Sequence, residues 1–359
     1  MRARSLLLLV VLSPLICGCG TLRYYSQAVS GHLNLMRRAA PIEEVLGRDA
    51  VMPVLKDKLQ AVLRIRDFAS RELALPDNGS YKRYADLGRP FVAWNVFAAP
   101  EFSVEPLGYC FPFAGCVGYR GYFSEADAQA ESAALRARGY DAHVGGVPAY
   151  STLGWFDDPV LNTFIHYPEA ELARLIFHEL SHQQLYVKDD TRFNESFATT
   201  VEQAGVDRWL AQQGSDLDRA AYERSQSRKG EFIALVLKYR SLLEQYYRQD
   251  LPPEEKRLGK AQRFAQMERD YAELKRSWDD FAGYDRWFAA KPNNATLASV
   301  ALYTELVPAL RALLEKEGGD LQRFYAAMKK LAALSKQERD ALFLASVRSS
   351  PDPSSAPRR

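Results

Sequence analysis

The pentapeptide at residues 178–182 constrains the fold more than any other part of the chain, because it reads H-E-x-x-H inside a segment with a helical pattern. A helix places His178 and His182 about 40° apart around its axis and about 6 Å apart along it, so both imidazoles can bind one ion. Glu179 projects nearby, where a carboxylate can take a proton from a zinc-bound water. The motif predicts a helix that carries Zn²⁺ on His178 and His182, with Glu179 as the catalytic base.

Two histidines do not complete a catalytic zinc site, so a third ligand is expected downstream. Glu195, on a second helix predicted from about Asn194 to Gln212, is the best candidate, and a family resemblance given below implies this choice. Twelve residues separate His182 from Glu195, which suffice for a last helical turn, a short loop and a helix start. The alternatives are Glu202, one further position on the same helix face, and then Asp189 or Asp190.

The N-terminus predicts export. Residues 1–18 have a basic start and an apolar run at 6–16 that is too short to span a bilayer, which is typical of a signal peptide. The sequence I-C-G-C at residues 16–19 resembles the lipobox of bacterial lipoproteins, in which Cys19 would be lipidated and would anchor the chain to a membrane. Gly20 is not the Asp that usually retains lipoproteins at the inner membrane, so the resemblance implies the outer membrane, facing the periplasm. The alternative is a plain secreted protein.

Export also affects the two remaining cysteines, Cys110 and Cys116. Both would face an oxidising compartment, and the Gly and Pro residues around them allow a small closed loop. A disulfide is therefore expected, and a metal-binding pair is the alternative.

Charge argues against a nucleic-acid partner. The chain has 47 Lys and Arg against 45 Asp and Glu, and removal of Arg2 and Arg4 with the signal peptide leaves side chains that sum to zero. A broad nucleic-acid surface requires a clear positive excess. The length of 359 residues also rules out a small disulfide-stapled scaffold.

The hydrophobic pattern predicts an α+β fold that is mostly α, with zincin-like active-site helices, a small β-rich region and a long helical hairpin. Helices are expected at 24–75, 124–138, 167–186, 194–212 and 295–343, and strands at 91–97, 117–123 and 141–154. Pro252 and Pro253 separate two helical stripes after Asp216, which indicates an antiparallel hairpin. The predicted divisions are a signal peptide at 1–18, an N-terminal helical segment at 19–89, a catalytic region at 90–215, a helical region at 216–346 and a disordered tail at 347–359.

Four features together resemble a known family: the lipoprotein signal, Y-S-T-L-G-W-F-D at 150–157, the motif at 178–182, and N-E-S-F-A at 194–198. They are similar to the putative aminopeptidase family of Gram-negative lipoproteins, over nearly all of the mature chain. The last segment resembles the N-E-G-F-A that supplies the glutamate ligand in gluzincin metallopeptidases. The resemblance implies a gluzincin-type zinc peptidase that acts on a peptide or protein substrate. The chain lacks the G-x-M-E-N segment with which familiar zinc aminopeptidases hold a free amine.

Several further assignments stay open at this level. Residues 144–150 are a candidate substrate-pairing strand or else a structural turn, and Tyr303 is a candidate oxyanion donor. Asp157 and Asp158 would bind a substrate ammonium group or form a surface turn. His143 and His166 would orient the metal ligands or serve as structural groups. The alternative to an enzyme is a lipid-anchored structural or binding protein that retains a zinc site and uses its helical hairpin to engage a partner.

Overall fold

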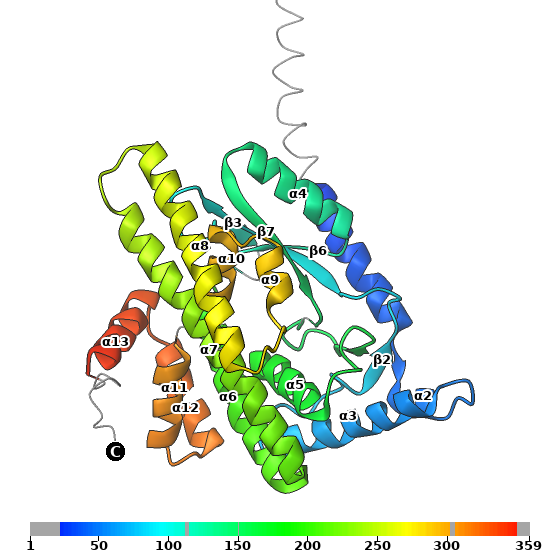
Figure 1. Cartoon of the computed structure of the whole chain (residues 1–359). Helices are drawn as coiled ribbons and strands as arrows, with labels where there is room; N and C mark the ends of the chain where they lie inside the picture. Colours follow the sequence, from blue (N-terminus) through cyan, green and yellow to red (C-terminus); the bar gives the residue numbers. More distant parts are fainter. Residues whose placement is uncertain (1–21, 112–114, 150, 302–305, 350–359) are drawn as a thin grey trace, which may run out of the picture.

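The computed structural model describes residues 22–111, 115–149, 151–301 and 306–349 (Figure 1). It is mostly helical with few short strands, which confirms the α+β, mostly α prediction. The strands are β1 (Ala40–Pro41), β2 (Arg83–Ala85), β3 (Ala93–Pro100), β4 (Tyr109–Phe111), β5 (Gly115–Val117), β6 (Arg120–Tyr122), β7 (Tyr140–Val147) and β8 (Val160–Leu161). A helix at residues 22–38 precedes α2 (Ile42–Leu46), α3 (Pro53–Arg71), α4 (Glu125–Ala137), α5 (Glu169–Gln184), α6 (Thr191–Gln213), α7 (Asp216–Tyr247), α8 (Pro253–Ser277), α9 (Asp285–Ala289), α10 (Asn294–Ala301), α11 (Val307–Lys316), α12 (Leu321–Ala332) and α13 (Lys336–Ser349).

The N-terminal part is divided more finely than expected. Three helices occupy the range predicted as one helical stretch at 24–75. Pro41 lies in β1 just before α2, and Pro53 is the first residue of α3. Proline lacks the amide hydrogen needed inside a helix but suits its first turn, so these two residues explain where the breaks fall.

A three-stranded antiparallel sheet with the order β6-β3-β7 stands beside the helical body. Trp94 and Val96 of β3 pack with Leu135 of α4 on one face, whereas Phe97 packs with Ala295 of α10 on the other. The alternation of side chains along β3 therefore buries both faces of this strand. The strand predicted at 117–123 is two short pieces, β5 and β6, in different sheets.

The helices α5 and α6 pack against each other at the centre of the main hydrophobic core, and α3 covers α5. Phe177 of α5 and Phe193 and Phe197 of α6 are almost fully buried. The helix α6 begins at Thr191, three residues earlier than predicted. Asp190 is its N-cap, and its side chain accepts a hydrogen bond from the Phe193 amide, which satisfies one of the free amide groups at the helix start.

The expected hairpin is formed by α7 and α8, which lie side by side (Figure 1). Ser215 and Asp218 form a capping box at the start of α7, and Pro253 opens α8.

The single helical stretch expected at 295–343 is α10 to α13, with Gly318 and Gly319 in the left-handed region between two of these helices. The last helix reaches Ser349, so residues 347–349 of the predicted tail are helical. No helix in the described ranges is long and apolar enough to cross a bilayer.

Candidate metal centre

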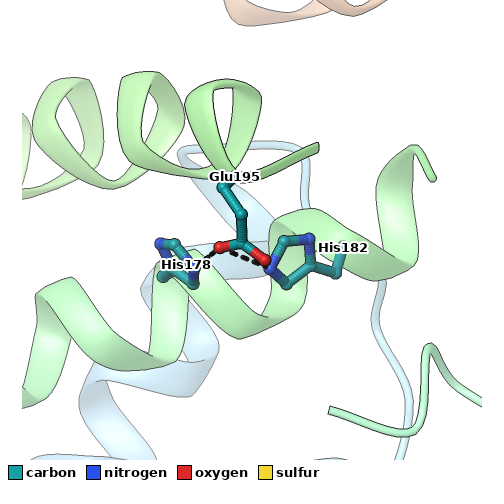
Figure 2. A group of neighbouring side chains, drawn as sticks. All are labelled: His178, His182 and Glu195. Atoms are coloured by element: carbon teal, nitrogen blue, oxygen red, sulfur yellow. Dashed lines mark hydrogen bonds and ion pairs between the residues drawn. The ribbon is translucent and has the colours of Figure 1, made fainter. Parts of the chain in front are cut away.

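Three side chains converge between α5 and α6 (Figure 2). His178 and His182 project from successive turns of α5, and Glu195 reaches them from the second turn of α6. Oε2 of Glu195 lies 3.2 Å from Nε2 of His178 and 3.7 Å from Nε2 of His182. Each residue offers one ligand atom, and all three atoms lie within 4.8 Å of one another.

These separations suit a tetrahedral metal ion. Zinc binds His nitrogen and carboxylate oxygen at about 2.0 to 2.2 Å, so two ligands of one tetrahedral ion lie about 3.4 Å apart. The two measured separations fall on either side of that value. Two imidazoles and one carboxylate also leave a fourth position for water or substrate, as catalytic zinc sites do. The donor set of His178, His182 and Glu195 therefore fits Zn²⁺.

Glu202, which the sequence offered as a substitute for Glu195, has a different place. Its Oε2 lies 2.8 Å from Nδ1 of His178, the ring nitrogen that does not face Glu195, and 3.1 Å from Nη1 of Arg174. An ionised carboxylate can only accept hydrogen bonds, so Glu202 holds the proton of His178 on Nδ1 and leaves Nε2 for a metal. Glu202 is thus a partner of a ligand, and it is 2% exposed.

Asp189 and Asp190, the remaining acids between the two helices, are also engaged elsewhere. Oδ1 of Asp189 accepts a hydrogen bond from the Cys116 amide. Asp190 caps α6 and forms a buried ion pair with Arg339, whose Nη2 lies 2.8 Å from Oδ2. Neither belongs to the group of converging ligand atoms.

Burial and neighbouring carboxylates set the charges at this centre. Burial alone would lower the pKa of His178, but hydrogen bonds with Glu195 and Glu202 outweigh it and raise the pKa to about 10. Burial lowers the pKa of His182 to about 4, so that its ring is neutral and able to bind a metal. The hydrogen bond between Nε2 of His178 and Glu195 holds a proton at the position that a metal ion would take. Metal binding would displace this proton.

Glu179 lies beside the ligands and lines the same cleft. Burial raises its pKa to about 7, and the negative charge of Glu195 adds to the shift, whereas His178 opposes it. A carboxylate with a pKa near neutrality can accept and return a proton at physiological pH, as a general base must.

The cleft around these residues has a volume of about 640 Å³, and aromatic side chains form part of its lining. Residues 145–149, at the end of β7 and just after it, form one wall. Because the sheet order is β6-β3-β7, one side of β7 has no strand neighbour among the described residues. The predicted substrate strand thus lies at the edge of a sheet and faces the cleft, although Tyr150 falls outside the described residues. The aromatic side chains of the cleft are Tyr24, Phe97, Phe111, Tyr119, Tyr122, Phe123 and Tyr186.

Tyr119 is a candidate functional residue that sequence reasoning missed. Burial raises its pKa, and the nearby charge of Glu195 adds to this, so its hydroxyl stays protonated and can donate a hydrogen bond. It lies between β5 and β6, and no motif marks it in the sequence. The residue chosen from the sequence, Tyr303, lies outside the described residues.

The polar residues outside the two helices are not part of the centre. Asp158 is buried, and its Oδ2 accepts a hydrogen bond from the Thr152 amide, whereas Asp157 is exposed. Neither lines the cleft, whose carboxylates within the described part of the chain are Glu179 and Glu195. The ring of His143 stacks on Phe97, and that of His166 packs against its neighbour Tyr167.

Cys110 and Cys116 form a disulfide that joins β4 and β5. Phe111 and Val117, the neighbours of these cysteines, line the cleft, so the disulfide secures one of its walls. Residues 112–114 between them are outside the described ranges, as is Cys19.

The comparisons with known proteins give one match. Residues 23–343 fit the model of a family described as "Putative aminopeptidase". No curated protein and no solved structure matches the chain significantly. The matched range contains α5 and α6, the sheet and the helical hairpin, and it covers most of the sequence. The chain belongs to the putative aminopeptidase family.

Proposed function

We propose that this protein is a zinc-dependent peptidase of the gluzincin type, anchored through Cys19 to the outer membrane and facing the periplasm. The family description suggests peptidase activity. The observation that carries the proposal is the position of Glu195 Oε2 between the Nε2 atoms of His178 and His182. This arrangement stands in a cleft large enough for a peptide segment.

Each residue of the centre then has a defined task. Zinc, when bound by His178, His182 and Glu195, supplies Lewis acidity to the scissile carbonyl and to the attacking water. Glu179 takes the proton of the attacking water and later gives it to the departing amine. Glu202 keeps the His178 ring oriented, and Arg174 holds Glu202 in its ionised form.

The cleft also supports a binding mode for the substrate. An extended peptide can add to the free edge of β7 through backbone hydrogen bonds, beside the helix that carries Glu179. Tyr119 can donate a hydrogen bond to the oxyanion that develops on the scissile carbonyl. The aromatic lining of the cleft favours substrates with apolar side chains.

Aminopeptidase specificity is the finer part of the proposal. A desolvated ammonium group requires a paired negative charge. Glu179 and Glu195, the carboxylates that the described part of the cleft provides, already serve as general base and metal ligand in this proposal. The comparison of free and N-acetylated forms of one cleaved peptide decides this point. A strong preference for the free amine supports aminopeptidase action, and equal turnover of both forms contradicts it.

The peptidase proposal is tested with a peptide library on the purified protein and on Glu179→Gln. We expect the substitution to lower turnover by at least about a hundredfold, because it removes the general base, while the zinc content stays unchanged. The matched control is Glu169→Gln, which makes the same change on an exposed position of α5.

A different outcome would favour the other class of function. If wild type cuts no peptide, and wild type and Glu179→Gln perform identically in the cell, the protein is a lipid-anchored structural or binding protein that retains a zinc site. The long hairpin of α7 and α8 is then the element to test for a partner.

A further inference from the structure

The N-terminal helix, residues 22–38, exposes an apolar stripe. Leu22, Tyr25, Val29 and Leu33 are 73%, 38%, 58% and 46% exposed. They are spaced by three, four and four residues, so at 100° per residue they lie within about 80° of arc on one side of the helix. An apolar stripe of this kind on a soluble protein usually faces a binding partner.

The opposite side of the same helix is firmly packed. A Cβ added to Gly31 would lie 2.2 Å from the ring of Phe123, which shows how close the two elements are. The amide of Phe123 donates a hydrogen bond of 2.9 Å to Gln27, and Leu35 is 1% exposed. The stripe is therefore the outer face of a well-anchored helix.

A neighbouring loop extends the stripe. The ring of Phe156 lies 4.5 Å from the ring of His32 on the helix, and Phe156 and Trp155 are 51% and 78% exposed. Tryptophan is enriched where proteins meet the membrane interface. We call the following residues the apolar patch: Leu22, Tyr25, Val29, Leu33, Trp155 and Phe156.

The charge on the N-terminal helix favours an anionic partner. The sequence has no Asp or Glu between Gly20 and Ile42, but it has Arg23, Arg37 and Arg38. Asp127 of α4 pairs with Arg23 at 2.7 Å. Helices that lie flat on lipid typically combine apolar side chains with arginines and have no acidic residues.

We propose that the apolar patch rests on the surface of a phospholipid bilayer, with the N-terminal helix lying flat on it. This inference rests on the proposed lipid anchor at Cys19. Two residues separate Cys19 from Leu22, and a chain advances at most about 3.6 Å per residue, so Leu22 lies within about 11 Å of the anchor. A lipid-anchored chain therefore holds the apolar patch against the membrane.

This contact fixes the position of the catalytic cleft. Tyr24 and Ala28, on the packed side of the helix, line the cleft. The cleft is thus separated from the membrane by one helix diameter, about 10 to 12 Å. The docked enzyme acts on peptide segments close to the membrane surface.

The test uses the full mature chain with Cys19→Ser, which has no acyl group. Its binding to vesicles of phosphatidylethanolamine and phosphatidylglycerol, about three to one, is measured by flotation. The double substitution Val29→Asp/Leu33→Asp should lower the partition coefficient at least about tenfold, because it places two charges in the contact. Leu217→Asp/Leu258→Asp is the matched control, at exposed leucines of α7 and α8, and should bind as Cys19→Ser alone does.

Brominated lipids provide a second readout that needs no charged substitution. They should quench the fluorescence of the Cys19→Ser chain more than that of the same chain with Trp155→Phe. The inference would be overturned if the Cys19→Ser chain did not bind vesicles, or if Val29→Asp/Leu33→Asp bound them as well as Leu217→Asp/Leu258→Asp does. It would also be overturned if the chain formed a dimer that Val29→Asp/Leu33→Asp dissociates. None of these measurements depends on zinc, hydrolysis or acylation, so they fail or succeed separately from the proposed function.

Discussion

The carboxylate of Glu202 lies 2.8 Å from Nδ1 of His178, whereas Glu195 lies 3.2 Å from Nε2 of the same ring. One imidazole thus joins a candidate metal ligand on one side to a buried acid on the other. Because Glu202 also pairs with Arg174, this chain of contacts extends from the metal centre into the interface between α5 and α6. Such partners fix the ring orientation and raise its basicity toward the metal.

Glu202→Gln should therefore weaken zinc binding about 10- to 100-fold without removing a ligand. The amide keeps the shape of the side chain but loses the charge that acts on Nδ1. The measurement is competition with a zinc chelator. Glu171→Gln is the control, because Glu171 also binds Arg174, at 2.6 Å, but makes no contact with His178. Equal zinc affinity of the two variants would contradict the assigned role of Glu202.

Asp190→Asn should lower the free energy of unfolding by about 3 kcal/mol, because it leaves the buried guanidinium of Arg339 without its counter-charge. The asparagine can still cap α6, so the loss reports mainly on the ion pair. Urea unfolding measures the effect. Asp189→Asn, at the adjacent and more exposed residue, should cost about 1 kcal/mol or less. A loss of zinc in properly folded Asp190→Asn would show that Asp190 belongs to the metal centre after all.

The two glycines of β7 should respond differently to alanine. A Cβ on Gly146 would lie 2.4 Å from the ring of Phe91, whereas one on Gly145 would make only ordinary contacts, the nearest at 3.6 Å. Gly146→Ala should therefore lower stability by about 1 to 3 kcal/mol, and Gly145→Ala by less than about 0.5 kcal/mol. Thermal unfolding of both variants tests the pair, and equal effects would contradict the packing described for β7.

Asp158 should make stability depend on pH. Burial raises its pKa from 3.8 to about 6, although the Thr152 amide opposes the shift. The unfolded chain releases the carboxyl proton of Asp158 at a lower pH than the folded chain does. The free energy of unfolding therefore falls as pH rises from about 4 to about 6, and above that range it is lower by at most about 3 kcal/mol. Asp158→Asn should remove this contribution to the pH dependence of urea unfolding across the same range. The exposed Asp157→Asn should leave it intact, and an unchanged slope in Asp158→Asn would refute the assignment.

The convergence of His178, His182 and Glu195 could be predicted from the sequence because its signals are local. The spacing of His178 and His182 fixes their common helix face, and the distance to Glu195 permits a tight helix pair. The breaks in the N-terminal helical stretch were missed, although Pro41 and Pro53 mark them. The edge position of β7 could only be guessed, because strand order depends on contacts between distant segments.

Other roles depend on packing that no local pattern encodes. Glu202 stands on the same face of α6 as Glu195. Its contact with Nδ1 of His178 depends on how α5 packs against α6. The ion pair of Asp190 with Arg339 joins residues far apart along the chain, so no local pattern predicts it. Tyr119 faces the cleft from a short connection between two sheets, where neither periodicity nor a motif gives a signal.

The zinc content of the purified mature chain tests the central claim most directly. We predict about one zinc ion per chain by mass spectrometry, retained in Glu179→Gln and lost in His178→Ala and in Glu195→Ala, because only the last two remove a ligand. Less than about a tenth of an equivalent in wild type after gentle preparation, unchanged by His178→Ala, would contradict the zinc centre on which this account rests.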